Sequence, residues 1–154
     1  MTDKLAILII LLNCALLAAC GESPQTGQAR EYISAPGTEG LDLPFSAAVK
    51  TGNTIYISGN VGNIPGSLEL APGGIEAETR QTLENIKATL AAAGATMDDI
   101  VKCSVFMADM TEWPAMNEIY RQFFTRPPAR SALGANGLAL GAKVEIECLA
   151  VVDD

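Results

Sequence analysis

Residues 75–107 read IEAETRQTLENIKATLAAAGATMDDIVKCSVFM, and this stretch decides the fold class. Its first part predicts an amphipathic helix from Ile75 to about Ala93, because apolar or small side chains recur at three- and four-residue steps. Gly94 ends that helix, since glycine readily adopts the left-handed conformation that follows a last turn. The apolar run Val101–Ala108 then predicts a buried strand. A helix that leads into such a strand indicates a layer of helix packed on a sheet.

The sequence before this helix is rich in strand signals. Short strands are expected at Arg30–Ser34, Phe45–Lys50 and Thr54–Ser58. The last two are joined by a turn at 51–53, where glycine and asparagine accept a positive φ. A loop rich in glycine, proline and asparagine follows at 59–74 and leads into the helix.

The sequence after the buried strand adds one helix and two strands. The second helix is expected at Glu112–Phe124 with Thr111 as its N-cap, and the strands at Ser131–Gly134 and Lys143–Val152. The element order is therefore β-β-β-α-β-α-β-β, which predicts an α+β fold with a mixed sheet and both helices on one face. Four side chains of the second helix are expected in the core: Trp113, Met116, Tyr120 and Phe123.

The last strand predicts which face of the sheet the helices cover. Side chains alternate along a strand, so Val144, Ile146 and Cys148 should point one way and Glu145 and Glu147 the other. The face left uncovered by helices is then partly polar and suits packing between subunits.

Composition limits the possible chemistry. The chain has 154 residues, which suits one domain, with 18 acidic residues, 10 basic residues and a net charge of −8. An acidic surface repels phosphate backbones, so no nucleic-acid partner is expected. The chain has no histidine, which excludes Ser–His and Cys–His nucleophile pairs. It also has no phosphate-binding glycine loop and no metal-ligand spacing, so neither a cofactor nor a metal is expected.

The N-terminus predicts export. An apolar run from Leu5 ends in Leu17-Ala18-Ala19-Cys20, which resembles a bacterial lipoprotein box. Residues 1–19 would be the signal peptide, Cys20 the lipidated residue, 20–28 a flexible tether and 29–154 the domain. Gly21 after the cysteine favours the outer membrane, so we expect a lipid-anchored protein on the periplasmic side of the cell envelope. The alternatives are a plain signal peptide, a short membrane anchor, or a cytoplasmic protein with an unprocessed N-terminus.

Two further cysteines, Cys103 and Cys148, lie in strand-like runs. An oxidising envelope allows a disulfide between them, but only if the two Cα atoms lie close together. We expect two buried thiols that behave as small hydrophobic residues.

Several segments together resemble the RidA/YjgF family of imine deaminases, in matching order and spacing from about Pro44 to Val152. The most specific combination is Pro128-Ala129-Arg130-Ser131 followed by the Glu-x-Glu strand at 144–147. The other segments are Ile57-Ser58-Gly59, residues 79–86, Ala93-Gly94, residues 99–102, Val105-Phe106, residues 116–120 with Phe123-Phe124, and Ala150-Val151.

This resemblance implies a chorismate-mutase-like fold, a homotrimer with sites in the clefts between subunits, and hydrolysis of 2-imino acids to 2-keto acids and ammonia. Arg130 would hold the substrate carboxylate, because its planar fork forms two parallel charge-assisted hydrogen bonds. The backbone N–H of Gly59 would be a second donor to that carboxylate. Glu145 would orient the attacking water and take its proton. Glu147 is expected to be structural.

Two positions depart from the deaminase pattern. Phe45 stands where these enzymes usually have a tyrosine in the second strand, so a hydroxyl is missing, and Ala132 stands where they usually have a cysteine. Asn117 and Ser58 match positions near the family's site, either as direct contacts or as a surface amide and a strand-end hydroxyl. The alternative function is therefore a trimeric binder of small keto acids or other carboxylates with little or no turnover. Holdase and ribonuclease roles, both attached to family members, have no supporting feature in the sequence.

Overall fold

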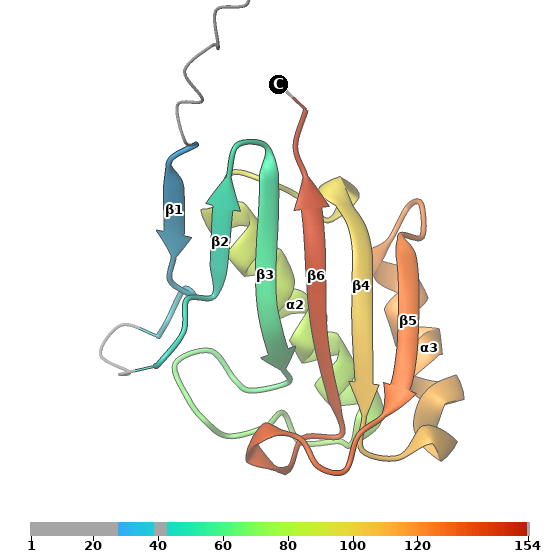
Figure 1. Ribbon diagram of the computed structural model, residues 1–154. Coiled ribbons are helices and arrows are strands. Elements are labelled where there is room, and N and C mark those ends of the chain that lie inside the picture. The colour runs from blue at the N-terminus through green and yellow to red at the C-terminus, as the bar shows by residue number, and fades with distance from the viewer. Residues whose placement is uncertain (1–27, 39–42, 154) are drawn as a thin grey trace, which may run out of the picture.

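The computed structural model describes residues 28–38 and 43–153, in which one mixed sheet is covered on one face by two helices (Figure 1). The strand order is β1-β2-β3-β6-β4-β5, and only β4 and β5 run parallel. The strands are β1 (Arg30–Ile33), β2 (Ala48–Thr51), β3 (Thr54–Val61), β4 (Ile100–Met107), β5 (Ala129–Gly134) and β6 (Val144–Val151). The helices are α2 (Ile75–Ala92) and α3 (Trp113–Tyr120), and short 3₁₀ turns occur at η2 (Met97–Asp99), η3 (Met110–Glu112), η4 (Arg121–Phe123) and η5 (Ala139–Gly141). The predicted α+β architecture and element order are confirmed.

Helix α2 ends at the glycine that the sequence indicated. Gly94 has a φ of +75°, and its N–H donates to the carbonyl of Ala91 at 3.1 Å. The N–H of Ala95 reaches back to the carbonyl of Leu90 at 2.8 Å, which completes a Schellman motif. The helix therefore stops sharply, and the chain turns back through η2 into β4.

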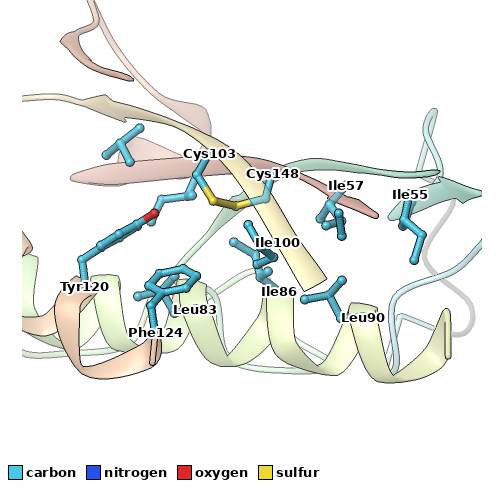
Figure 2. Packing of buried hydrophobic residues seen from close by; sticks show 14 of the residues in the cluster. Ile55, Ile57, Leu83, Ile86, Leu90, Ile100, Cys103, Tyr120, Phe124 and Cys148 are labelled. Carbon is cyan, nitrogen blue, oxygen red and sulfur yellow. A yellow bond between two sulfur atoms is a disulfide. The ribbon is translucent and has the colours of Figure 1, made fainter. Parts of the chain in front are cut away.

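The core lies between the sheet and α2, as Figure 2 shows. Along β6, buried Val144, Ile146 and Cys148 alternate with the more exposed Glu145 and Glu147, so the predicted face assignment is confirmed. The largest side chains with under 2% exposure include Ile55, Leu83, Ile86, Leu90, Val105, Met107, Met116 and Ile146.

The start of the second helix differs from the prediction. Thr111 is not the N-cap of an α-helix, because it lies inside the 3₁₀ turn η3. Asp109 caps that turn instead, and its carboxylate accepts hydrogen bonds from the N–H and the hydroxyl of Thr111 at 2.8 and 2.7 Å. These hydrogen bonds lower the pKa of Asp109. The predicted single helix is therefore three consecutive pieces: η3, α3 and η4.

Phe45 also lies elsewhere than expected. Strand β2 begins only at Ala48, so Phe45 precedes the strand and is 57% exposed. Conversely, β3 continues past Ser58 to Val61 and takes in residues that the sequence placed in a loop.

Lys143 fixes the start of β6. Its backbone N–H donates to the carboxylate of the buried Glu78 at 2.8 Å, and its Nζ donates to both carboxylate oxygens of Glu112 at 2.9 Å. Its carbonyl accepts from the N–H of Ala108 at 3.0 Å. The hydrogen bond with Glu112 raises the pKa of Lys143, so the ammonium stays charged. Lys143, two residues before Glu145, therefore connects the start of β6 to helix α2, to turn η3 and to the end of β4.

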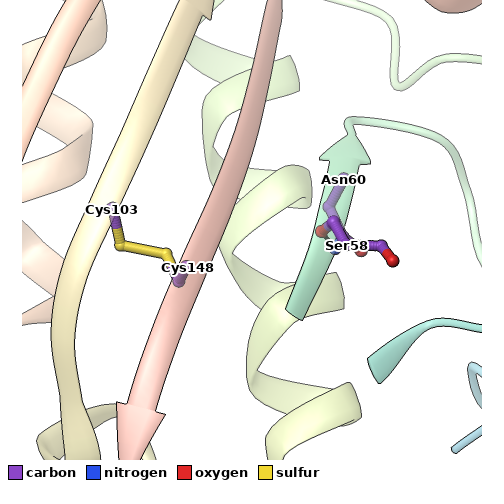
Figure 3. The surroundings of a disulfide bond; sticks show 4 residues. All are labelled: Ser58, Asn60, Cys103 and Cys148. Atoms are coloured by element: carbon purple, nitrogen blue, oxygen red, sulfur yellow. Dashed lines mark hydrogen bonds between the residues drawn. A yellow bond between two sulfur atoms is a disulfide. The ribbon is translucent and has the colours of Figure 1, made fainter. Parts of the chain in front are cut away.

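Cys103 and Cys148 form a disulfide, so the expectation of two buried thiols is wrong (Figure 3). The two residues are direct register partners on the antiparallel strands β4 and β6, and their Cα atoms lie 4.1 Å apart. Both side chains point to the helix-covered face, as Figure 2 shows. The sequence placed each cysteine on a strand but did not show that the two strands are adjacent and in register.

None of the helices in residues 28–38 and 43–153 is long and apolar enough to cross a bilayer. The expected signal peptide, Cys20 and most of the tether lie outside the described residues.

Removing the disulfide should lower stability without changing the fold. The bridge joins residues 45 positions apart, and constraining a loop of that size in the unfolded chain stabilises a protein by about 2–4 kcal/mol. We expect urea denaturation of the Cys103→Ala/Cys148→Ala variant to give a free energy of unfolding lower by about that amount. Wild-type protein in reductant should match the variant. An unchanged urea midpoint in both cases would contradict the assignment.

Candidate active site

Arg130 lies on the edge strand β5 and points toward helix α3. Its register partner on β4 is Cys103, which faces the helices. The guanidinium carbon Cζ lies 4.5 Å from the ring centroid of Tyr120 and 5.8 Å from that of Trp113. Both distances fall within the range in which an aromatic face attracts a cation.

A single hydrogen bond adds to this positioning. Nη2 of Arg130 donates to Oδ1 of Asn117 at 2.8 Å. Trp113, Asn117 and Tyr120 follow one another at four- and three-residue steps, so they lie on one face of α3. Asn117 is therefore more than a solvent-exposed amide on the helix surface, because its side chain binds Arg130. The family resemblance implied a position near the site for this residue.

The Tyr120 ring is fixed by the core. The residue is buried, its ring centroid lies 4.7 Å from that of Phe124, and its hydroxyl has no hydrogen-bond partner among the described residues. Burial raises the pKa of Tyr120 to about 12, and the nearby charge of Arg130 only partly opposes this rise. The phenol therefore stays neutral under any physiological condition.

Arg130 has no carboxylate partner in the described part of the chain. Three ion pairs form there, Lys87–Glu84, Arg121–Glu118 and Lys143–Glu112, and none includes Arg130. Arg130 is half-buried and has no acidic partner among these residues, although the chain has eight more acidic than basic residues. The site is therefore suited to an anion supplied from outside.

A second group of residues lies around a bulge in β3. Ile57 pairs with Cys148 and Asn60 with Ile146, so β3 contains one extra residue between these pairs. Such bulges bend a strand and redirect its side chains. Asn60 stabilises the bulge by donating from Nδ2 to the carbonyl of Ser58 at 2.7 Å (Figure 3).

The bulge brings Gly59 against the carboxylate of Glu145. A Cβ added to Gly59 would overlap Oε1 of Glu145 and would lie 3.0 Å from its Cδ. Gly59 does not have a positive φ, so an added side chain would meet crowding by the flexible end of Glu145 and no backbone strain. Gly59 and the Glu145 carboxylate are thus in direct contact, although the two residues are 86 positions apart in sequence.

The remaining predicted site residues are more dispersed. The Ser58 hydroxyl donates to the carbonyl of Ser46 at 2.7 Å, so its proton is already engaged. Ala132 lies two residues after Arg130 on the same face of β5 and packs partly against the core. Phe45 is exposed and outside β2.

Within one protomer, Arg130 and Glu145 do not meet. Arg130 faces α3, whereas Glu145 lies on the face of the sheet that the helices leave uncovered. Strand β4 separates them, and Arg130 lies level with Cys148, three residues along β6 from Glu145. Standard strand spacing and rise put their Cα atoms about 14 Å apart.

The sequence interpretation missed the role of two aromatic residues. Trp113 and Tyr120 were expected only as core residues, yet both rings also lie against Arg130. Their spacing with Asn117 on one helix face was a signal, but which strand passes that face cannot be read from helical periodicity.

Known proteins are similar to this chain in sequence and in fold. The sequence pattern of the family described as Endoribonuclease L-PSP matches residues 34–152. A 2-iminobutanoate/2-iminopropanoate deaminase from Dermatophagoides farinae is 40% identical over 125 residues, which cover 80% of this chain and 98% of that protein.

The chain belongs to the RidA/YjgF family.

Two solved structures agree with this membership. The YjgF gene product of E. coli superposes with a TM-score of 0.72 at 36% identity, over 80% of this chain and 99% of that one. E. coli TdcF with bound serine superposes with a TM-score of 0.73 at 33% identity, over 80% and 99% of the two chains. The RidA/YjgF fold predicted from the sequence is thereby confirmed.

The contact between Gly59 and Glu145 can be tested by a double-mutant cycle. Gly59→Ala should lower the free energy of unfolding by about 0.5–1.5 kcal/mol, the cost of forcing the flexible Glu145 side chain out of its rotamer. In the Glu145→Ala background the same change should cost much less, because the overlapping carboxylate is gone. Urea denaturation of the four proteins measures both values. Strictly additive effects would contradict the contact.

Proposed function

We propose that this RidA/YjgF protein hydrolyses 2-imino acids to 2-keto acids and ammonia. The observation that carries the proposal is the half-buried guanidinium of Arg130, which is held by Asn117 and Tyr120 and lacks a carboxylate partner in the described residues. A relative at 40% identity bears the name of this activity, which supports the same assignment.

Arg130 would bind the substrate carboxylate. A guanidinium has five N–H donors, and within the described residues the Arg130 side chain donates one hydrogen bond, to Asn117. The remaining donors can form the two parallel hydrogen bonds of a fork-to-carboxylate pair. The structural relative TdcF from E. coli was solved with bound serine, and serine carries such a carboxylate.

Glu145 would act as the general base for the attacking water. As the water oxygen bonds to the imine carbon, one water proton passes to the Glu145 carboxylate, which then gives it to the imine nitrogen, so that a carbinolamine forms. Glu145 next takes the carbinolamine hydroxyl proton and passes it to the amine nitrogen as the carbonyl forms and the C–N bond breaks, so that ammonia leaves and the carboxylate is regenerated. The absence of a side chain at Gly59 lets the Glu145 carboxylate lie against the backbone, and the Gly59 N–H would be a second donor to the substrate carboxylate.

We further propose that the complete site forms between copies in a homotrimer. Arg130 and Glu145 lie on opposite faces of one sheet, so a single small ligand reaches both only if each comes from a different protomer. The uncovered face also exposes apolar side chains that an interface would bury: Tyr32, Tyr56 and Leu133.

A binding role with little turnover is the second candidate. Deaminases of the family usually have a tyrosine where this chain has Phe45, so the tyrosine hydroxyl is missing here. The Phe45 ring is exposed in the single chain. A trimer of this kind would retain the Arg130 clamp for keto acids. Tight binding of 2-ketobutyrate without accelerated ammonia release would favour this role.

Substitution of the two charged residues tests the proposed hydrolysis. In a coupled assay, an amino-acid oxidase generates the imine and ammonia release is measured. Arg130→Ala should lower kcat/KM about 100-fold, since a charge-assisted hydrogen-bonded pair is lost. Glu145→Gln should lower kcat by about 100- to 10,000-fold, the usual contribution of a general base.

Matched controls are available in the same chain. Arg121→Ala removes an exposed arginine that pairs only with Glu118, and Glu147→Gln neutralises an exposed carboxylate on the same face of β6. Both should leave turnover within about 2-fold of wild type, as surface changes usually do. Equal activity of Arg130→Ala and wild type would refute the site.

We also propose that the chain is exported and anchored by a lipid on Cys20, followed by a tether at 20–28 and the domain at 29–154. The lipoprotein-like segment Leu17-Ala18-Ala19-Cys20 supports this, and so does the disulfide between Cys103 and Cys148. Stable disulfides form in oxidising compartments such as the periplasm and are rare in the cytosol. The location that we propose is the periplasmic side of the outer membrane.

Replacing the lipidated residue tests the location. In a Gram-negative host, the wild-type chain should sediment with membranes, and Cys20→Ser should shift it to the soluble fraction because the acyl chains are lost. Detergent should release the wild type, and a Cys14→Ser variant serves as the matched control. Identical fractionation of Cys20→Ser and wild type would contradict lipid anchoring.

A further inference from the structure

We infer that Tyr120 is a positioning residue for Arg130: the face of its ring holds the guanidinium in the orientation that receives the ligand carboxylate. This inference rests on the proposed function, because it assigns Arg130 a ligand. It concerns a buried aromatic residue that the sequence predicted only as part of the core.

The ring holds the cation without using its donors. Cζ of Arg130 lies 4.5 Å from the Tyr120 centroid, so the contact is with the π-face. Asn117 accepts a hydrogen bond from Nη2 only. An acidic partner would neutralise the guanidinium and occupy its in-plane donors, whereas a ring attracts the charge from above and leaves that edge available.

Two contacts of different kinds are enough to fix a planar group. The ring restrains the plane of the guanidinium, and the hydrogen bond to Asn117 restrains its rotation within that plane. Trp113 adds a second, more distant ring at 5.8 Å. Positioning of this kind improves binding because less side-chain freedom is lost when the ligand arrives.

Tyr120 is itself rigid. It is 4% exposed and packs at 4.7 Å against the ring of Phe124, and both lie in the core beside α2 (Figure 2). Its hydroxyl has no partner in the described residues. The ring, not the hydroxyl, is therefore the part of Tyr120 that acts on Arg130.

Three substitutions separate this role from simple packing. Tyr120→Phe keeps the ring and removes only the unpartnered hydroxyl. Tyr120→Leu removes the π-face under Arg130. Leu90→Ala removes a fully buried side chain of α2 that lies away from Tyr120 (Figure 2), and it leaves in place the two rings that contact the guanidinium. For each, calorimetry gives the Kd of 2-ketobutyrate, the coupled ammonia assay gives KM and kcat, and thermal unfolding gives Tm.

We expect Tyr120→Leu to raise KM and Kd about 3- to 30-fold, the range of a lost cation–π contact, with a smaller effect on kcat. Tyr120→Phe should match wild type in KM and Kd and be at least as stable. Leu90→Ala should lose Tm as Tyr120→Leu does, because a cavity is left in the core, but keep the wild-type KM and Kd. Equal KM and Kd for Tyr120→Leu and Leu90→Ala would overturn the inference.

A series of ring analogues at position 120 tests the inference even if the Tyr120→Leu variant does not fold. Phenylalanine analogues with one, two or three fluorine atoms at position 120 weaken the negative ring face while nearly preserving its shape. The Kd of 2-ketobutyrate should rise stepwise along the series, and a constant Kd would overturn the inference. If wild type itself neither hydrolyses imines nor binds 2-ketobutyrate, the proposed function fails instead.

Discussion

A half-buried guanidinium without a carboxylate partner is the constraint on which the rest of the site depends. The chain carries eight more acidic than basic residues, yet the acidic side chains in its described part leave Arg130 to an amide and two rings. Leaving a cation unpaired costs stability, and the aromatic faces offset part of that cost. What remains is an oriented positive charge with available donors, which a small organic acid would satisfy.

The topology keeps Arg130 and Glu145 of one chain apart. Strand β4 lies between β5 and β6, and the alternation of side chains sends Arg130 toward the helices and Glu145 toward the uncovered face. The bulge at Ser58 and Gly59 then places glycine beside the Glu145 carboxylate, and Glu78 and Lys143 fix the chain just before it. Each half is thus rigidly built, and association of protomers is the proposed means of joining them.

Local patterns in the sequence predicted much of this, and the failures share one cause. Helix α2 was placed within one residue at its end, because its periodicity and Gly94 are local signals. The alternation in β6 identified the face of Glu145 for the same reason. The Cys103–Cys148 bridge, the position of Phe45 and the contact of Tyr120 with Arg130 all depend on strand register or strand limits, which tertiary pairing sets. Thr111 failed as a cap because the 3₁₀ turn already begins after Asp109, whose carboxylate accepts from the N–H and the hydroxyl of Thr111.

Complementation between subunits tests the central claim most directly. Arg130→Ala and Glu145→Gln proteins, each inactive alone, are mixed in equal amounts, unfolded, refolded together and assayed for ammonia release from imines. If each site takes Arg130 from one protomer and Glu145 from its neighbour, about a quarter of the sites in random trimers contain both native residues, so activity returns to about that fraction. No recovery from well-folded mixed trimers would contradict a site shared between protomers.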